Sequence, residues 1–252
     1  MIPIDLSGKT ALITGASQGI GKQIARTFHK AGANVAINHL GLPNTTVDAQ
    51  ALADELNLVR TDSAIIIAAD VAQPEQVKSM MGEVQAWQDG LDFLINNAAI
   101  IKDRTIAKMD FKEWDDVIDV NLSGVFYCCK FGLEIMNDHG AIVSFGSIAA
   151  LEGFFGQANY ASAKAGVQAM MRVLSREAAR KNIRANSVAP GVIDTSMAAT
   201  IPAAVQAEML KNVPLNRFGT TEEVANVVLF LCSPLASYVT GQTIEINGGW
   251  RG

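Results

Sequence analysis

The sequence is poor in residues that define several large protein classes. It contains three cysteines and three histidines in 252 residues. The histidines, His29, His39 and His139, form no HxxH or HExxH pattern, so they predict no zinc site. The cysteines are too few for a disulfide framework and lack metal-ligand spacing. We therefore expect no bound metal, and we interpret the cysteines as small apolar fillers in a reducing compartment.

Clusters of like charge are also lacking, and so are long apolar runs. The net charge is −5, charged residues make up 18%, and no run of five or six like charges occurs. This disfavours nucleic acid as a partner. One long uncharged run, residues 224–244, is interrupted by Pro234, Gly241 and polar side chains, so it is not expected to span a membrane. The N-terminus has no basic segment before an apolar stretch. We expect a cytoplasmic protein without a membrane partner.

What the sequence does have is a regular alternation of short apolar runs and longer helical patterns. The apolar runs are residues 9–14, 34–38, 63–69, 91–96, 141–145, 183–188 and 242–246. Helical patterns fill the intervals, as at residues 19–31, where Ile20, Ile24 and Phe28 recur at four-residue steps. Apolar strands separated by helices indicate a parallel sheet covered on both faces.

The predicted fold class is therefore α/β. We expect a single doubly wound Rossmann-type domain over residues 1–252, with a seven-stranded parallel sheet. Further helices are predicted at residues 45–58, after Pro74, within 111–136, and at 159–180 and 220–232. Residues 191–214 are less regular and rich in Ala, Thr, Met and Pro, which favours a mobile lid over a site.

A glycine-rich turn follows the first apolar run and opens the first helix. Residues 14–21 read TGASQGIG. Such a turn brings backbone N–H groups and the positive end of a helix to a pyrophosphate, and a Cβ would hold the phosphates away. A purely structural turn is the alternative, but the position at the first βα junction favours a nucleotide. The residues expected to bind it are Gly15, Ser17, Gln18, Gly19, Ile20 and Gly21.

A second group of residues indicates acid/base chemistry. Tyr160 and Lys164 are four residues apart on a predicted helix and therefore share a face. A free tyrosine is a poor base at neutral pH, because its pKa is about 10, but a nearby ammonium favours the phenolate. Ser147 ends the fifth strand region, and its hydroxyl can donate to a carbonyl oxygen that gains charge. Each residue alone has an ordinary structural interpretation, whereas the set together with the glycine turn favours catalysis.

Together these motifs resemble those of the short-chain dehydrogenase/reductase family. The matching residues are 14–21, Asn96-Asn97-Ala98-Ala99, Asn121, Ser147, Tyr160 with Lys164, and Pro190-Gly191. The family usually has glycine where this chain has Ala99. The resemblance implies hydride transfer between a nicotinamide cofactor and a carbonyl or secondary alcohol. It makes Tyr160 the general acid/base, with Lys164 lowering its pKa and holding the nicotinamide ribose. It also implies that Asn121 supports a proton relay.

The cofactor implied by the resemblance is NADP(H), with NAD(H) as the alternative. An acidic residue at the end of the second strand selects NAD through the ribose 2′-hydroxyl, and no Asp or Glu lies between Asp5 and Asp48. Asn38 and His39 stand there instead and can donate hydrogen bonds to a phosphate, although an exposed loop position is the alternative for His39. For Asp70, a helix N-cap remains the alternative to adenine contact. The other cofactor contacts implied are Val71, Asn97, Ala98, Tyr160, Lys164, Pro190, Gly191, Ile193 and Thr195.

Several stretches resemble 3-oxoacyl-acyl-carrier-protein reductases and acetoacetyl-CoA reductases, namely residues 101–104, 156–161 and 240–249. This implies a small-molecule carbonyl substrate, with a CoA or acyl-carrier-protein thioester as the candidate. It also implies a homotetramer, formed through the helices that carry Asn121 and Tyr160. A polyol, sugar or other alcohol dehydrogenase of the same family is the alternative, and a non-catalytic nucleotide sensor is disfavoured by the complete motif set.

The expected substrate pocket is apolar, whereas the expected docking surface is mixed. The pocket candidates are Ile148, Ala149, Leu151, Phe154, Phe155, Met197 and Met209. An acidic carrier protein would need a basic surface. Lys130, Arg180, Lys181 and Arg184 are basic, but Glu134 lies among them in the sequence. The apolar pocket therefore favours an acyl, alkyl or aryl ketone over a free sugar. The mixed charges of the surface do not decide between coenzyme A and an acyl carrier protein as the carrier of the thioester.

Overall fold

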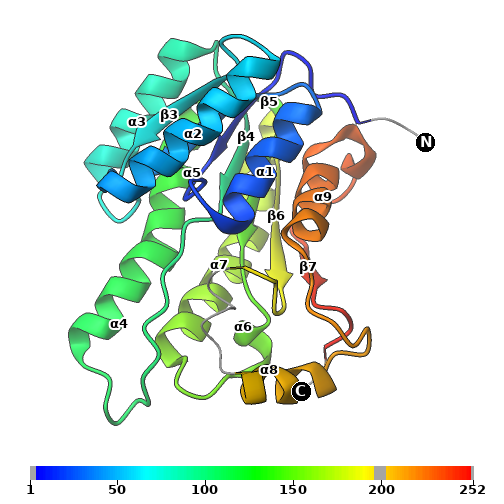
Figure 1. The fold of residues 1–252 in the computed structure, drawn as a ribbon. Helices are drawn as coiled ribbons and strands as arrows, with labels where there is room; N and C mark the ends of the chain where they lie inside the picture. The colour runs from blue at the N-terminus through cyan, green and yellow to red at the C-terminus, as the bar shows by residue number, and fades with distance from the viewer. Residues whose placement is uncertain (1–3, 196–202, 251–252) are drawn as a thin grey trace.

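A computed structural model of the chain describes residues 4–195 and 203–250. Within them, seven strands form one sheet in the order β3-β2-β1-β4-β5-β6-β7 (Figure 1), and all neighbouring strands are parallel. The strands are β1 (Thr10–Ile13), β2 (Asn34–His39), β3 (Ala64–Ala68), β4 (Leu91–Asn96), β5 (Met136–Phe145), β6 (Arg184–Pro190) and β7 (Thr243–Ile246). The strand order reverses between β1 and β4, which confirms the predicted doubly wound sheet. Ligands of such sheets bind at this switch point, beyond the carboxyl ends of the strands.

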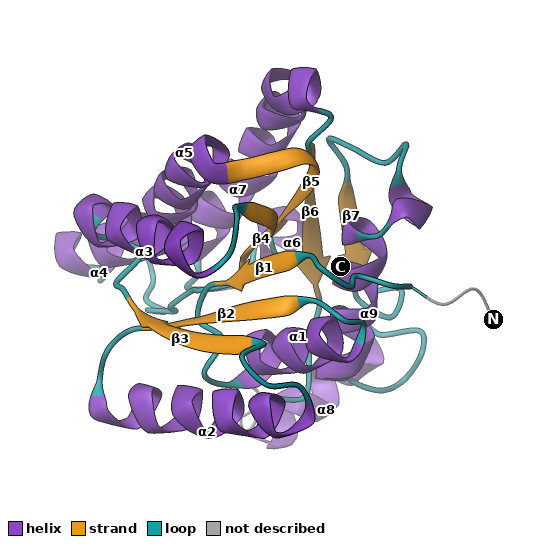
Figure 2. Cartoon of the chain, turned by 90° about the horizontal axis from the view of Figure 1, so that it is seen from above, coloured by secondary structure: helices purple, strands orange, loops and turns teal. Residues whose placement is uncertain are grey.

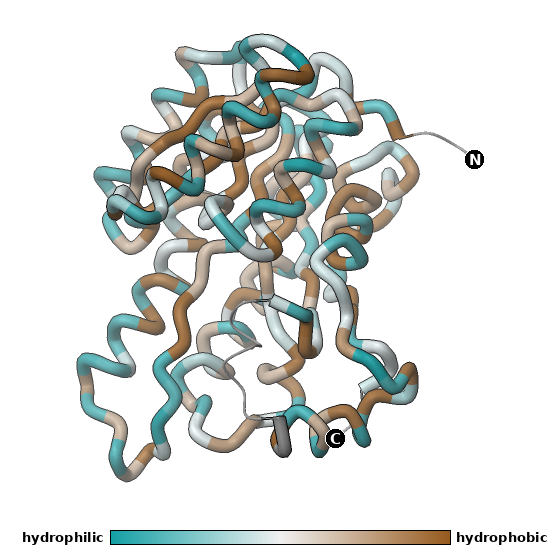
Figure 3. The backbone as a smooth tube through the Cα atoms, in the orientation of Figure 1, coloured by the Kyte–Doolittle hydropathy of each residue, from teal (hydrophilic) through white to brown (hydrophobic). Residues whose placement is uncertain are grey.

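Helices cover both faces of the sheet (Figure 2). One layer contains α1 (Gly19–Lys30), α2 (Pro43–Val59) and α9 (Thr221–Cys232), and the other contains α3 (Pro74–Trp87), α5 (Gly124–Ile135) and α7 (Ala158–Glu177). Shorter helices, α4 (Phe111–Ile118), α6 (Ala149–Glu152) and α8 (Ala203–Lys211), lie toward the carboxyl edge of the sheet (Figure 1). The helices alternate between hydrophobic and hydrophilic residues along their turns (Figure 3), as amphipathic helices do.

The core lies on both sides of the sheet because successive strand side chains point to opposite faces. In β1, Ala11 and Ile13 join the cluster under α1, α2 and α9, whereas Leu12 joins the cluster under α3, α5 and α7. All four residues of β1 are buried. Burial on both faces explains why the strands are apolar throughout rather than alternating.

One long helix contains a turn that the sequence does not predict. From Phe111 to Ile135 the chain stays helical, but Asp119–Ser123 between α4 and α5 is a π-helix. The N–H of Gly124 donates to the carbonyl of Asp119, five residues earlier. Asn121 lies within this wider turn, and such turns are frequent at functional sites.

The segment expected to be a lid is only partly described. Ile193 pairs with Gly219 in an isolated bridge, and residues 203–211 form α8. Residues 196–202, including the pocket candidate Met197, lie outside the described residues. Across the two described ranges, no helix combines the length and the hydropathy that a membrane crossing requires. Residues 4–195 and 203–250 also hold no group of three or more His, Cys, Asp or Glu side chains that could bind a metal ion.

Candidate active site

The glycine-rich turn joins β1 to α1 at the carboxyl edge of the sheet. Gly15 and Gly19 have φ angles of +62° and +56°, which glycine adopts at no steric cost. A Cβ on Gly15 would lie 2.9 Å from the Cα of Ala98, and one on Gly21 would lie 2.6 Å from Nδ2 of Asn97. The turn is therefore packed directly against residues 97–98, and larger residues would force the two segments apart.

The N-terminus of α1 fits an anion. Gln18, the N-cap residue, makes no side-chain capping bond, and the first turn has no acidic residue. The N–H groups of a first helical turn have no partners within the helix, and they attract phosphate. A Cβ on Gly19 would meet nothing within 4 Å, so the space beside the turn is open. Ser17 is buried, whereas Ile20 is partly exposed. These residues fit the pyrophosphate of a dinucleotide.

Three polar side chains hold the glycine turn in place. Oγ1 of Thr14 accepts the N–H groups of Asn97 and Ala98 at 3.0 and 3.1 Å. Nδ2 of Asn97 donates to the carbonyls of Thr14 and Gly15 at 2.8 and 3.1 Å. Oδ1 of Asn38 accepts the N–H of Gly15 at 3.1 Å. Asn97 and Ala98 therefore support the turn from the end of β4. Thr14, the first residue of the motif, is a supporting residue that was not among the expected binding residues.

Asn38 is occupied by backbone contacts, and His39 is buried; a phosphate contact of His39 stays a prediction. Asn38 is 1% exposed, and its Nδ2 donates to the carbonyls of His39, Ile67 and Ala69. It therefore positions the backbone and has no donor left for a phosphate. His39 is 2% exposed, so it is not an exposed loop residue. Its Nδ1 accepts the N–H of Gly41 at 3.2 Å, and burial lowers the pKa of His39. The end of β2 thus lacks the carboxylate that would select NAD, and it also lacks a positive charge that would attract the 2′-phosphate of NADP.

Two expected adenine contacts follow β3. Oδ1 of Asp70 accepts the N–H of Ala72 at 3.0 Å, and the N-cap residue of α3 is Gln73. Asp70 is therefore not the cap of that helix, and it stays partly exposed. Val71 is buried beside the start of α5, where a Cβ on Gly124 would lie 3.0 Å from the Val71 carbonyl oxygen. The adenine contact itself stays a prediction for both residues.

The expected nicotinamide contacts follow β6. The carbonyl of Pro190 accepts the N–H of Ile148 at 3.3 Å, and the N–H of Gly191 donates to the carbonyl of Ile246 at 2.9 Å. Ile193 is buried, and its carbonyl accepts from Oγ1 of Thr195 at 3.3 Å. These bonds fix the segment beside the end of β5, where Ser147 lies.

Ser147, Tyr160 and Lys164 are brought together at the end of β5. Lys164 is 1% exposed, and its Nζ donates to the carbonyl of Phe145 at 2.8 Å. The same Nζ lies 5.6 Å from the centroid of the Tyr160 ring. Oγ of Ser147 accepts the N–H of Ala149 at 3.1 Å and is a hydrogen-bond partner of Tyr160. The three side chains thus form one cluster, as the motif predicts.

Burial governs the protonation of this cluster. It raises the pKa of Tyr160, the hydrogen bond with Ser147 lowers it by less, and the charge of Asp103 raises it slightly further. Burial also lowers the pKa of Lys164 to about 7. The expected lowering of the Tyr160 pKa by Lys164 is not seen, because desolvation disfavours the charged form of both groups. The cluster holds a neutral phenol beside an amine that titrates near neutral pH.

Asn121 is fully buried in the π-helical turn. Its Oδ1 accepts the N–H of Ile100 at 2.9 Å, and its Nδ2 donates to the carbonyl of the same residue at 2.9 Å. The side chain therefore ties the long helix to the segment that follows β4. The proton relay expected of Asn121 stays a prediction.

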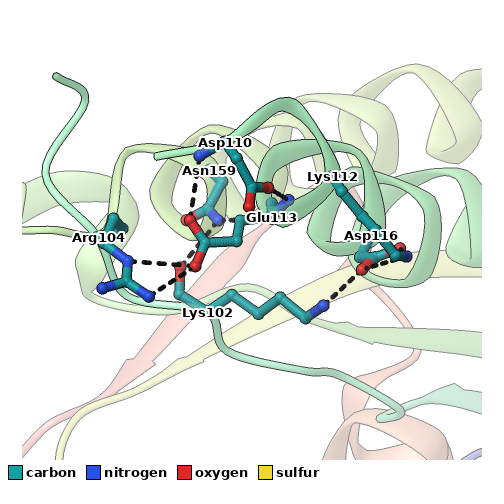
Figure 4. Close-up of polar contacts among 7 residues, drawn as sticks. All are labelled: Lys102, Arg104, Asp110, Lys112, Glu113, Asp116 and Asn159. Atoms are coloured by element: carbon teal, nitrogen blue, oxygen red, sulfur yellow. Dashed lines mark hydrogen bonds and ion pairs between the residues drawn. The ribbon is translucent and has the colours of Figure 1, made fainter. Parts of the chain in front are cut away.

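Asn159 is a site residue that the sequence interpretation missed. It is fully buried, its Nδ2 donates to the carbonyls of Lys102 and Glu113 at 3.1 and 3.0 Å, and its Oδ1 accepts the N–H of Tyr160 at 2.7 Å. Figure 4 shows the contacts of Asn159 with Lys102 and Glu113, beside the ion pair of Arg104 with Glu113. The start of α7, and with it Tyr160, is locked to α4 and to the loop before it. The signal that could have identified Asn159 is an asparagine at the start of a predicted helix.

An apolar cluster lies next to Ser147. Ile148, Val213 and Trp250 are its buried members, and Phe154 and Met209 pack against them. The rings of Phe154 and Trp250 meet edge to face, with centroids 5.7 Å apart. Trp250 was not among the predicted pocket residues. Two predicted ones, Leu151 and Phe155, are 56% and 91% exposed, so neither belongs to this cluster.

The fold and the clustered Ser147, Tyr160 and Lys164 define an oxidoreductase with a nucleotide-binding α/β domain. The family model described as enoyl-(acyl carrier protein) reductase matches residues 15–251. The 3-oxoacyl-acyl-carrier-protein reductase FabG of Staphylococcus aureus (strain Mu50 / ATCC 700699) is 42% identical over 243 residues, which are 96% of this chain and 97% of that protein. The chain belongs to the short-chain dehydrogenase/reductase family.

Solved structures agree with this assignment. A short-chain dehydrogenase/reductase of Brucella melitensis, described as a glucose/ribitol dehydrogenase, superposes with a TM-score of 0.93 at 35% identity, over 98% of each chain. A short-chain dehydrogenase of Burkholderia cenocepacia J2315 in complex with NADP superposes with a TM-score of 0.91 at 31% identity, over 97% of this chain and 98% of that one. The family and the enzyme class expected from the motifs are thereby confirmed.

Proposed function

We propose that the protein uses NADP(H) to reduce a 3-oxoacyl thioester, or a similar small ketone, to a secondary alcohol. The observation that carries the proposal is the partly buried phenol of Tyr160, hydrogen-bonded to the Ser147 hydroxyl and packed against Lys164. The similarity to a 3-oxoacyl reductase supports the substrate class. The similarity to an NADP complex supports the cofactor, as does the lack of a carboxylate at the end of β2.

The residues present fit a dinucleotide at the carboxyl edge. The glycine turn and the uncapped start of α1 would hold the pyrophosphate. Asp70 and Val71 would contact the adenine, Lys164 the nicotinamide ribose, and residues 190–195 the nicotinamide. When bound, the reduced cofactor supplies the hydride for the carbonyl carbon.

The protein supplies the proton and stabilises the carbonyl oxygen. Burial keeps the proton on Oη of Tyr160, and a general acid for ketone reduction needs this protonated form. A serine hydroxyl has one donor and two acceptor sites. Oγ of Ser147 accepts the N–H of Ala149. Its proton faces Tyr160 in this structure and would be donated to the carbonyl oxygen when a substrate binds. Tyr160 and Ser147 would therefore both donate hydrogen bonds to the carbonyl oxygen of the substrate, which gains negative charge during the reaction.

The carrier of the thioester is coenzyme A or an acyl carrier protein, and the similarity to a 3-oxoacyl-acyl-carrier-protein reductase supports the carrier protein. Of the basic residues after α7, Arg184 does not face outward, because its guanidinium donates to the carbonyls of Leu231 and Ser233. Nζ of Lys181 donates to the carbonyl of Leu133 at 3.4 Å. Lys130, Arg180 and Lys181 remain exposed, and their positive charges are available to an acidic partner. The apolar cluster of Ile148, Trp250 and their neighbours suits an acyl chain.

We also propose a cytoplasmic homotetramer in which residues 191–214 act as a lid. The helices expected to form the interface expose large apolar side chains, among them Phe111 on α4, Phe126 on α5 and Val173 on α7. Three cysteines that are all free and buried suit a reducing compartment. Size-exclusion chromatography with light scattering tests the assembly, and a mass other than four chains would refute it.

The activity is tested by following reduced cofactor with acetoacetyl-CoA, crotonyl-CoA and simple ketones, and oxidised cofactor with ribitol. We expect acetoacetyl-CoA reduction with NADPH, slower reduction with NADH, and a loss of about a hundredfold or more for Tyr160→Phe. Turnover of crotonyl-CoA alone would indicate enoyl reduction instead. Turnover of ribitol alone would indicate a polyol dehydrogenase. Cofactor binding without any turnover would favour the nucleotide sensor.

A further inference from the structure

One face of α7 contacts the end of β5 through three polar side chains. Tyr160, Lys164 and Gln168 follow one another at four-residue steps, which places them on the same face of the helix. Tyr160 pairs with the Ser147 hydroxyl, and Lys164 donates to the Phe145 carbonyl. Nε2 of Gln168 donates to the carbonyl of Ser147 at 3.2 Å. The third contact belongs to no motif of the sequence.

The local backbone is built around the Gln168 amide. Gln168 is only 4% exposed, and burying an amide is unfavourable unless it is hydrogen-bonded. A Cβ on Gly146 would lie 2.8 Å from Nε2 and 2.9 Å from Cγ of Gln168. Because position 146 is glycine, the Gln168 amide has the space that it needs to reach the carbonyl of Ser147. An apolar side chain would fill position 168 without the cost of burying an amide.

The bond from Gln168 completes the fixation of one peptide unit. The peptide between Ser147 and Ile148 is held at its N–H end, because Ile148 donates to the carbonyl of Pro190 at 3.3 Å. Gln168 holds the same peptide at its carbonyl end. The Ser147 hydroxyl is held separately by the N–H of Ala149. The N–H of Ala150 donates to the same Ser147 carbonyl at 3.2 Å. Without Gln168, the carbonyl end of the peptide would keep only this bond from its own turn and would lose its tie to α7.

We infer that Gln168 is a positioning residue for Ser147. It orients the Ser147–Ile148 peptide so that the Ser147 hydroxyl faces Tyr160 and the oxygen of the substrate. This inference rests on the proposed ketone reduction, in which Ser147 stabilises developing charge. Donors do so only when their geometry is fixed before the reaction. The hydrogen bond of the Gln168 side chain goes to the Ser147 carbonyl, so Gln168 acts through Ser147.

The test combines Gln168→Met, which keeps length but removes the donor, with Ser147→Ala. In the wild-type background, we expect Gln168→Met to lower kcat by about tenfold to a hundredfold, with the KM for NADPH unchanged. In the Ser147→Ala background, we expect Gln168→Met to change kcat by less than about twofold. The Ser147 hydroxyl that Gln168 positions is already absent there, and the effects of coupled residues do not add. Gln168→Leu is the second variant if the first does not fold. An equal loss in both backgrounds, or no loss in the first, would overturn the inference.

A control separates positioning from loss of stability. Val167 is fully buried on the neighbouring position of α7, and Val167→Ala is expected to lower the melting temperature without lowering kcat. The ultraviolet titration of Tyr160, taken as the difference from Tyr160→Phe, needs no turnover. Gln168→Met should raise the pKa of Tyr160, because a displaced Ser147 no longer lowers it, and should not change it further with Ser147→Ala. An unchanged titration would refute Gln168 as a positioning residue, whereas an inactive wild type would refute only the proposed reduction.

Discussion

Lys164→Met is predicted to stabilise the protein at neutral pH while it abolishes ketone reduction. Lys164 is 1% exposed and has one hydrogen-bond acceptor, the carbonyl of Phe145. Its charged form is therefore poorly solvated in the folded chain, and burial lowers its pKa from 10.5 to about 7. Methionine has a similar length and no charge, so it fills the same space without the desolvation cost.

The magnitude follows from the pKa. The difference between 10.5 and about 7 corresponds to about 5 kcal/mol, at about 1.36 kcal/mol per pH unit. The folded pKa of Lys164 lies below the unfolded one, so the unfolded chain binds more protons between these two pH values. Stability therefore falls as the pH drops through this window, and the full cost is present below about pH 7. The unpaired Phe145 carbonyl costs the variant about 1–3 kcal/mol, which leaves a net gain of about 2–4 kcal/mol.

Urea unfolding of wild type and variant from pH 6 to pH 10 measures this gain. Protein concentration is held constant, because assembly contributes to apparent stability. We expect the variant to be more stable at pH 7. The gain should shrink as the pH rises and reverse toward pH 10, where the cost of the unpaired Phe145 carbonyl outweighs what is left of the desolvation cost. Lys181→Met, at an exposed lysine beyond α7, is the control and should leave the free energy of unfolding unchanged. A variant that is less stable than wild type at every pH, by a constant amount, would mean that the Lys164 charge is fully compensated.

Three further predictions concern other contacts of the site and the core. Asn159→Ala leaves two carbonyls and one N–H without their partner, and should lower the free energy of unfolding by about 2–4 kcal/mol; a loss under about 1 kcal/mol in urea unfolding would contradict the burial argument. Gly21→Ala brings a methyl group to 2.6 Å from Nδ2 of Asn97, and should weaken NADPH binding in a fluorescence titration. An unchanged affinity would show that the turn accommodates the methyl group without losing its shape. The three cysteines are buried, and burial raises the pKa of Cys129 to about 12, so a thiol reagent should label them only after unfolding.

Features with a local cause could be predicted from the sequence. Residues 91–96 form β4 with the predicted bounds, and the helix predicted at 19–31 begins at Gly19 and ends at Lys30. Both follow from the spacing of apolar residues along one segment. β5 begins five residues earlier than predicted, because residues 137–140 are polar or glycine and extend the strand only through pairing of Met136 with Leu91.

The roles of individual polar side chains depended on contacts between distant segments. Asn38 was expected at a phosphate, but its donors reach carbonyls at the ends of β2 and β3. Gln168 reaches a residue that is 21 positions away, and Asn159 reaches one that is 57 positions away. No periodicity encodes such contacts. The composition of a motif identifies the reacting groups, whereas the groups that hold them appear only when the strands and helices are assembled.

The side chains that hold the site share one chemical property. Asn38, Asn97, Asn121, Asn159 and Gln168 all end in amides, and each bonds to backbone groups near the reacting residues. An amide keeps one protonation state across the physiological range, whereas a carboxylate or a histidine in the same place would change its bonds with pH. The backbone contacts that these five amides make are therefore independent of pH. The pH dependence of the reaction should come from the coupled titration of Tyr160 and Lys164, and its apparent pKa values belong to that pair.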